Sequence, residues 1–570
     1  MPVKIMLDSF FSIVYKLIMA TIRKQKVGKY TYWQIVESRR VNGKPRPFVL
    51  AHLGTAEQLL YKLKEGPLKK KIRSASHGAV HLFYKTATEL DLVNIFTKNF
   101  TQQNRDGLKT GQSLLLAALH RAINPGSKRA FASWAKQTTL PDLAKYNPKK
   151  LDSQHFWDQM DTVTDQQLEA VEMEITLKLK EKGLLTPKLL FYDLTNFYTY
   201  IDSANEKSEL VKRGQNKQKR NDLRQFGLAQ IVTKDFLLPV FSSVYAGNKT
   251  DKELFITQLT RLRKKLAELS ITVEEVTLVF DKGSNTKGNF AELDDKEIPF
   301  VASLSPAYHE DLINIPESSY TKTEKHIYCR TRKEVWGKER TIVLYVSEKL
   351  RQGQLRGLEQ ALKKKYEQLT ALKTALSNPR AKKKELSTVE EKVQKILKGE
   401  RGQELIKVTI LEKEKGRFEL TWELDKDFYR WLTEMYYGKK ILVTCREEWN
   451  SEDIIHAYNG QSNVERVFKH FKNPYHNSVQ PQFHWTDQKI KVHTFICVTG
   501  LLLSQVILKK AKYLGYTSSI ETIIDELSRV RQAEIVTLTG LKGKPLREIQ
   551  LEEIEPELEK MYNDMVEMAI

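Results

Sequence analysis

Tyr458-Asn-Gly-Gln-Ser-Asn-Val-Glu465-Arg-Val-Phe-Lys-His-Phe-Lys472 predicts an amphipathic helix that packs on a core and presents a carboxylate. At about 100° per residue, four polar residues share a stripe roughly 60° wide: Tyr458, Gln461, Glu465 and Lys472. An apolar face lies beside it: Val464, Val467, Phe468 and Phe471. A carboxylate presented in this way suits a metal ligand, and the lysine on the same stripe suits contact with a phosphate. Taken alone, the pattern is more typical of a solvated helix face.

Composition points to a soluble, multidomain protein with a polyanionic partner. The 570 residues can bury a large core and should form more than one domain. The 93 Lys+Arg against 71 Asp+Glu leave a formal charge of +22, which favours nucleic acid as the partner. A basic protein without such a partner is the alternative.

Cysteine usage and apolar runs bear on the compartment. Cys329, Cys445 and Cys497 are far apart and odd in number, so they indicate neither a disulfide framework nor a cysteine zinc site, and a reducing cytoplasm fits. No apolar run reaches the roughly 18 residues needed to span a bilayer, so no membrane partner is expected. The short apolar segment 10–22 suggests that Met19 is the true start instead of Met1.

The first third of the chain predicts a small β-structure followed by helices. Within residues 1–55, two strand-like runs flank Asn42-Gly43, which is a hairpin turn signal with a basic tip. Residues 56–185 are mainly helical by pattern, with a buried helix that ends at Asn124-Pro125-Gly126. This helical region predicts either a helix-turn-helix-like DNA reader or a plain scaffold.

The rest of the chain alternates between strands and helices. Residues 186–305 have a mixed α/β pattern and residues 306–450 interrupt it with a hairpin and a leucine-rich helical hairpin around Asn378-Pro379. Residues 451–510 contain the opening helix and a long apolar helix, and residues 511–570 are expected to be helical.

Two strands end in aspartate. Leu189-Leu-Phe-Tyr-Asp193 and Val276-Thr-Leu-Val-Phe-Asp281 are continuous apolar runs typical of buried strands, although an aspartate in such a place is often a turn former. Strands that end at one edge of a sheet place these side chains in the crevice where α/β proteins bind ligands. With Glu465, three carboxylates there would need cations, and hard oxygen ligands favour two Mg²⁺ or Mn²⁺ ions. This predicts cleavage or transfer of nucleic-acid strands.

The order Asp193, Asp281, Glu465, with a helix between and a final helix, is that of a ribonuclease-H-like nucleotidyltransferase core. At these residues the chain resembles bacterial insertion-sequence DDE transposases with a Y-R-E-K signature, in the IS-four-like superfamily and its IS-sixteen-thirty-four-like group. Tyr458 and Lys472 match the Tyr and Lys of that signature, whereas Gln461 stands where it has Arg. Supporting resemblance covers 32–54, 212–251 and 483–493.

The resemblance implies an α/β ribonuclease-H-like core, a mixed sheet with flanking helices, plus a helical N-terminal region and an α+β insertion domain at 306–450. It implies cut-and-paste transposition: each element end is nicked, the freed 3′-OH attacks the opposite strand to give a hairpin, and the reopened end joins target DNA. Asp193, Asp281 and Glu465 would hold two Mg²⁺ or Mn²⁺ ions, and Tyr458 and Lys472 would grip the phosphate. The implied partner is double-stranded DNA, bound by at least a homodimer in a bacterial or archaeal cytoplasm.

Further candidates carry competing interpretations. A basic loop is either a DNA-backbone contact or solvated: Lys212, Arg213, Lys217, Lys219 and Arg220. Gln461 and Lys469 are also candidate DNA contacts. Trp336, at a predicted hairpin tip, either stacks on a flipped base or packs. Three histidines lack zinc-site spacing and are expected to be structural: His470, His476 and His484.

Two other functions compete with transposition. One is a ribonuclease-H-like DNA nuclease that cuts without joining, which strand-transfer products would distinguish. The other is a catalytically dead transposase-derived DNA-binding protein. The presence of Asp193, Asp281 and Glu465 argues against the second, and Gln461 is the feature that favours it.

Overall fold

The computed structural model describes residues 20–64, 70–102, 108–202, 204–215, 220–378, 383–480, 482–537 and 546–569. The expected start at Met19, and the basic-loop residues Lys217 and Lys219, lie outside the described residues. The chain divides into two compact units. The first contains Met1–Ala79, Lys136–Thr139 and Glu526–Tyr562, and the second contains Val80–Ala135, Leu140–Asp525 and Asn563–Ile570.

The first unit contains two antiparallel three-stranded sheets. The predicted hairpin is confirmed as β2 (Tyr30–Val41) and β3 (Lys44–Thr55), and β1 (Ala20–Val27) adds a third strand. Asn42 (φ 52°) and Gly43 (φ 78°) both adopt the left-handed backbone that a two-residue hairpin turn requires. Helix α2 (Ala56–Lys64) follows.

The second sheet of this unit corrects two predictions. It has the order β18-β17-β4, formed by β4 (Lys70–Ser76), β17 (Arg531–Thr537) and β18 (Leu546–Leu551). The predicted helical regions 56–185 and 511–570 therefore each contain strands. Strand β4 pairs with a segment more than 450 residues away, and such a distant partner leaves no signal in local periodicity.

Most of 56–185 is helical, as predicted. The second unit contains α4 (Leu92–Asn99), α5 (Thr110–Ile123), α6 (Phe131–Lys136), α7 (Leu140–Leu143), α8 (Ser153–Asp161) and α9 (Asp165–Glu181), and α3 (Gly78–Glu89) begins at its boundary. Helix α5 is buried along nearly its whole length and ends at Asn124. Asp152 caps α8 by accepting a hydrogen bond from the His155 amide at 2.9 Å.

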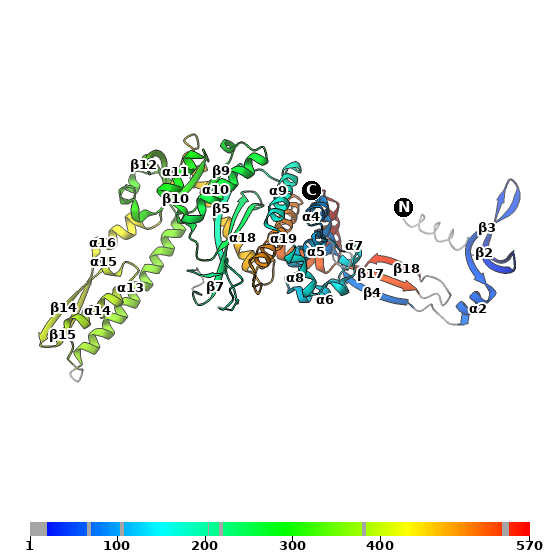
Figure 1. The fold of residues 1–570 in the computed structure, drawn as a ribbon, viewed down its shortest axis with the longest axis horizontal. Helices are drawn as coiled ribbons and strands as arrows, with labels where there is room; N and C mark the ends of the chain where they lie inside the picture. Colours follow the sequence, from blue (N-terminus) through cyan, green and yellow to red (C-terminus); the bar gives the residue numbers. More distant parts are fainter. Residues whose placement is uncertain are drawn as a thin grey trace, which may run out of the picture. The chain divides into compact units, whose positions relative to one another are not determined.

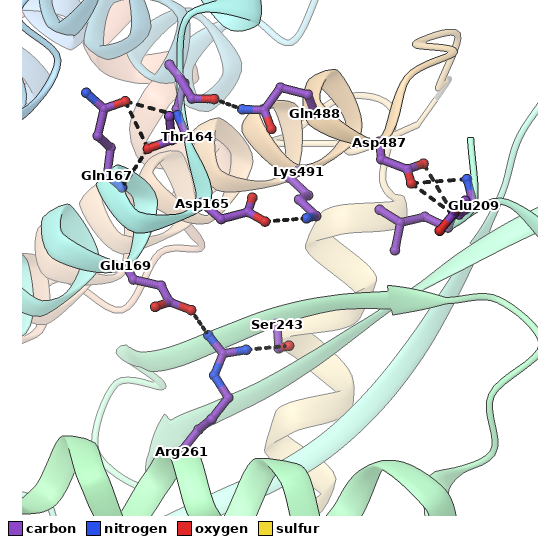
Figure 2. A network of polar contacts seen from close by, with 12 residues as sticks. Thr164, Asp165, Gln167, Glu169, Glu209, Ser243, Arg261, Asp487, Gln488 and Lys491 are labelled. Carbon is purple, nitrogen blue, oxygen red and sulfur yellow. Dashed lines mark hydrogen bonds and ion pairs between the residues drawn. The ribbon is translucent and has the colours of Figure 1, made fainter. Parts of the chain in front are cut away.

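Helix α19 (Asp487–Tyr513) is the central helix of this unit and packs on α5, α8 and β8. It is long and apolar enough to cross a membrane, but 89% of its most apolar window is buried inside the protein, as in a core helix. Polar contacts fix it at one end (Figure 2): Lys491 pairs with Asp165 at 2.6 Å, and Asp487 accepts hydrogen bonds from the backbone amides of Glu209 and Leu210.

A ten-stranded mixed sheet forms the core of the second unit (Figure 1). Its order is β11-β12-β13-β16-β10-β9-β5-β7-β6, with β8 paired to β7. The strands that matter for the site are β5 (Leu189–Tyr198), β6 (Lys212–Arg213), β7 (Arg224–Thr233), β8 (Pro239–Ala246), β9 (Thr277–Phe280) and β10 (Phe300–Leu304). Strands β5, β9 and β10 are mutually parallel, and β7 and β8 are antiparallel to their neighbours.

Helices cover both faces of this sheet. Even-numbered side chains of β5 and β9 face α10 (Asp251–Glu268), because Phe255 contacts the rings of Tyr192 and Phe280. Odd-numbered side chains, including Phe191 and Val279, share a buried cluster with α17 (Ser451–Asn459), α18 (Ser462–Lys472) and α19. Helix α11 (Lys287–Asp295) packs through Phe290 on Phe280 and Phe300.

The stretch 306–450 differs from a separate inserted domain. Its strands β11 (Thr321–Lys322), β12 (Ile327–Val335), β13 (Lys338–Val346) and β16 (Lys439–Thr444) continue the core sheet beyond β10. The predicted helical hairpin is present as α13 (Glu348–Ser377) and α14 (Leu386–Leu397), which form their own core with β14 (Ile406–Glu414) and β15 (Arg417–Leu424).

Candidate functional site

The register of the parallel strands places the two aspartates side by side. In β5 and β9, Leu190 pairs with Leu278 and Phe191 with Val279. Continuing this register by two residues sets Asp193 beside Asp281, on strands that lie about 4.8 Å apart. Both are odd-numbered, so both carboxylates belong to the face that α17 and α18 cover.

A third residue joins this row from β10. Val301 pairs with Val279, and the same register sets Ser303 beside Asp281. The Ser303 hydroxyl donates a hydrogen bond to Oδ1 of Asp281 at 2.9 Å, and the Tyr458 hydroxyl donates to the same oxygen at 3.1 Å. Burial, and then the charge of Asp281, raise the pKa of Tyr458, so its hydroxyl stays protonated and acts as a donor.

Lys440 brings a cation to the same aspartate. Its Nζ lies 5.5 Å from the ring centroid of Tyr458. Burial lowers the pKa of Lys440, and the nearby charge of Asp281 opposes that shift. Sequence analysis missed both Ser303 and Lys440, because their roles follow from strand pairing instead of local pattern.

The predicted single helix 451–472 is two helices. Helix α17 ends at Asn459 and α18 begins at Ser462. At the break, Gly460 packs on Phe191, and a Cβ there would lie 2.4 Å from Cζ of that ring. The amphipathic pattern runs through the break, so periodicity alone did not reveal it.

Gln461 does not occupy the exposed DNA-facing position that was predicted. It is 9% exposed, and its Nε2 donates to the backbone carbonyl of Tyr192 at 2.9 Å. The side chain therefore fixes the break between α17 and α18 to the strand residue just before Asp193.

The position of Glu465 follows from the contacts at the two ends of α18. Gln461 contacts Tyr192, and Nζ of Lys472 lies 5.7 Å from the ring centroid of Phe197. A helix rises about 1.5 Å per residue, so the segment from 461 to 472 spans about 16 Å. A strand rises about 3.3 Å per residue, so the segment from 192 to 197 spans about the same length. Helix and strand thus run alongside each other, and Glu465, one turn or about 6 Å after Gln461, lies level with Leu194, the strand residue next to Asp193.

A cavity of about 180 Å³ lies beside β5 beyond the end of β9. Asp193, Asp281 and Lys472 line it, and so does Asp251, the first residue of α10. Glu465 is exposed on α18 and is not among the lining residues. The carboxylate of Asp251 packs on Gly283, where a Cβ would lie 2.8 Å from its Oδ2. Sequence analysis did not single out Asp251.

The remaining candidate DNA contacts are on the surface. Lys212 and Arg213 form the exposed edge strand β6, and Lys469 is exposed one turn after Glu465. Arg220 is exposed, pairs with Asp222 at 2.8 Å and lies over the ring of Tyr198.

Two sequence alternatives can be compared with side-chain contacts. Trp336 packs on Phe290, with ring centroids 4.3 Å apart, as the packing alternative predicted. His493 is 2% exposed inside α19 and contacts Lys128 and Arg121.

Family models match two parts of the chain. The model described as the IS1634 family transposase N-terminal domain matches residues 18–77. The model of the transposase DDE domain matches residues 195–480, which is half of the chain and includes Asp281 and Glu465. The chain belongs to the DDE transposases, and its N-terminal segment is similar to the IS1634 family. This transposase is therefore a DNA-cleaving and strand-transferring enzyme that binds DNA and depends on divalent metal ions.

Other comparisons add little to this assignment. No curated protein matches the transposase in sequence. A solved structure described as the cryo-EM structure of a piggyBac transposase synaptic complex with hairpin DNA aligns with 8% identity and a TM-score of 0.35, covering 79% of each chain.

Proposed function

We propose that this transposase cuts the ends of an insertion sequence and joins the freed 3′-OH to target DNA by a cut-and-paste route, with Asp193, Asp281 and Glu465 as metal ligands. The observation that carries the proposal is the strand register that sets Asp193 beside Asp281 on one face of the sheet. The path of α18 along β5, which brings Glu465 level with the residue next to Asp193, supports the third ligand.

The proposed core is ribonuclease-H-like. Its support is the strand order β8-β7-β5-β9-β10, in which three strands are parallel and the first two in this order alternate in direction. The first aspartate lies on the central strand and the second follows the neighbouring parallel strand, at the carboxyl edge where open α/β sheets bind ligands.

The donor chemistry of the site fits hard cations. Carboxylate oxygens are the ligands that Mg²⁺ and Mn²⁺ prefer, and two ions are proposed. Such ions, when bound, activate a water and stabilise the leaving oxygen of a phosphodiester. The two hydrogen bonds to Asp281 both end on Oδ1, so Ser303 and Tyr458 orient the carboxylate while Oδ2 can ligate.

Other residues are proposed to hold the DNA. Lys472 lines the cavity and its ammonium can contact the phosphate next to the scissile bond. Lys212 and Arg213 on the exposed edge, with Lys469 on α18, supply backbone contacts. Gln461 acts indirectly, because it holds the carbonyl of Tyr192 next to Asp193. Pairing of two element ends makes a homodimer on DNA the proposed assembly.

The test uses labelled duplexes with the gene's own flanking sequence, a target duplex and Mg²⁺ or Mn²⁺. Wild type should nick at the element boundary and yield joined products. Asp281→Asn should bind DNA but do neither, whereas the control Asp161→Asn, on a surface aspartate 53% exposed, should behave as wild type. Nicking without joined products would favour the nuclease alternative, and no cleavage with either ion would overturn the proposal.

A further inference from the structure

A second group of potential metal ligands lies away from the catalytic cavity. His470, in the last turn of α18, His476, in the turn that follows, and Glu521, in α20 (Ile520–Ser528), bring their ligand atoms within 4.8 Å of one another. Nδ1 of His470 lies 3.3 Å from Oε1 of Glu521, and the two imidazole centroids are 5.3 Å apart. All three residues belong to the second compact unit.

His476 has a buried ring nitrogen that is suited to metal binding. Its side chain is 1% exposed, and within the described parts of the chain its Nε2 has no hydrogen-bond partner. A neutral imidazole nitrogen without a hydrogen-bond partner can offer its lone pair to a metal ion. A buried acceptor without a partner otherwise costs free energy.

We propose that His470, His476 and Glu521 bind one zinc ion, with water in the fourth position. Zinc bonds of about 2.0–2.1 Å in a tetrahedron hold ligand atoms about 3.4 Å apart, and the His470–Glu521 separation already matches this spacing. Rotation of the side chains closes the remaining gap. Two imidazoles and one carboxylate suit Zn²⁺ and not Mg²⁺, which prefers oxygen ligands.

The zinc site would brace the helix that carries Glu465 and Lys472. His470 lies between these two residues along α18. A bound ion would tie the last turn of α18 to α20. The site is distinct from the proposed carboxylate site in both ligands and metal.

The test measures zinc uptake by the full chain, independently of activity. Chelator-treated protein is dialysed against Zn²⁺ in excess Mg²⁺, which occupies oxygen-only sites, and bound zinc is then measured by atomic emission together with Tm. Wild type should retain one zinc per chain and gain Tm. Glu521→Gln and His476→Gln should weaken binding by at least about tenfold. His456→Gln, on an exposed histidine of α17, should retain one zinc.

Folding is controlled separately, because His476 is buried. Glu521 is partly exposed, so Glu521→Gln should keep the wild-type circular dichroism and still lose zinc. Co²⁺ added to wild type should give the intense visible bands of a tetrahedral site. Wild type that takes up no zinc, a six-coordinate Co²⁺ spectrum, or undiminished zinc binding by a folded Glu521→Gln would each overturn the proposal.

Discussion

Ser303→Ala tests whether strand pairing prepares Asp281 for a metal ion. Ser303 is 6% exposed, and its hydroxyl bonds to Oδ1 of Asp281 at 2.9 Å. Removing a hydrogen-bond partner of a metal ligand typically weakens metal binding by about 10–100-fold. Because Tyr458 keeps its own bond to the same oxygen, the loss should lie near the lower bound, about tenfold in affinity. Ser303→Ala should therefore raise the half-saturating Mg²⁺ concentration for nicking about tenfold.

The assay measures nicking of a labelled element-end duplex over a Mg²⁺ series. Saturating Mg²⁺ should restore most of the rate, because Ser303 positions a ligand and does not touch the DNA. The matched control is Ser504→Ala, which removes a buried hydroxyl of α19 that bonds to the Gly500 carbonyl at 2.9 Å. If Ser303→Ala and Ser504→Ala require the same Mg²⁺ as wild type, the positioning argument fails.

Two further predictions concern stability. Gly460→Ala places a Cβ 2.4 Å from Cζ of Phe191, so it should lower the free energy of unfolding in urea by about 1–3 kcal/mol. The control Gly288→Ala adds its Cβ into open space and should leave that free energy unchanged. Equal stability of the two variants would contradict the packing at the helix break. Burial, then the charge of Arg121, lower the pKa of Lys128 from 10.5 to about 7. The unfolded chain then binds more protons between these values, so stability should rise from pH 7 toward pH 10.5. Lys128→Met should flatten that rise, and an unchanged slope would refute it.

The parts of the site that are encoded locally could be predicted from sequence. Apolar runs that lead into aspartate indicated Asp193 and Asp281. The prediction that the strand ends at Asp193 was wrong, because β5 continues to Tyr198, whereas β9 does end just before Asp281. The helical hairpin of α13 and α14 followed from its leucine spacing in the same way. In each case the signal lies within one segment, which is where periodicity carries information.

What depends on distant pairing could not be predicted. Ser303 carries no motif, and its role appears only when β10 is aligned with β9. The break at Gly460 depends on one contact with Phe191, which the helical pattern does not record. Asp251 begins a helix, and nothing in the local sequence shows that it lines the cavity. Likewise, Glu521 lies 45 residues beyond His476 in sequence, outside any zinc-site spacing.

The most direct test of the central claim compares Glu465→Gln with Asp251→Asn in nicking of the element-end duplex, with DNA binding measured in parallel. Glu465 is the proposed third ligand, whereas Asp251 is the third carboxylate that lines the cavity. The account predicts that Glu465→Gln binds DNA and loses nicking in both Mg²⁺ and Mn²⁺, while Asp251→Asn keeps measurable nicking. Wild-type nicking by Glu465→Gln, with loss in Asp251→Asn, would contradict the account and assign the third ligand to α10.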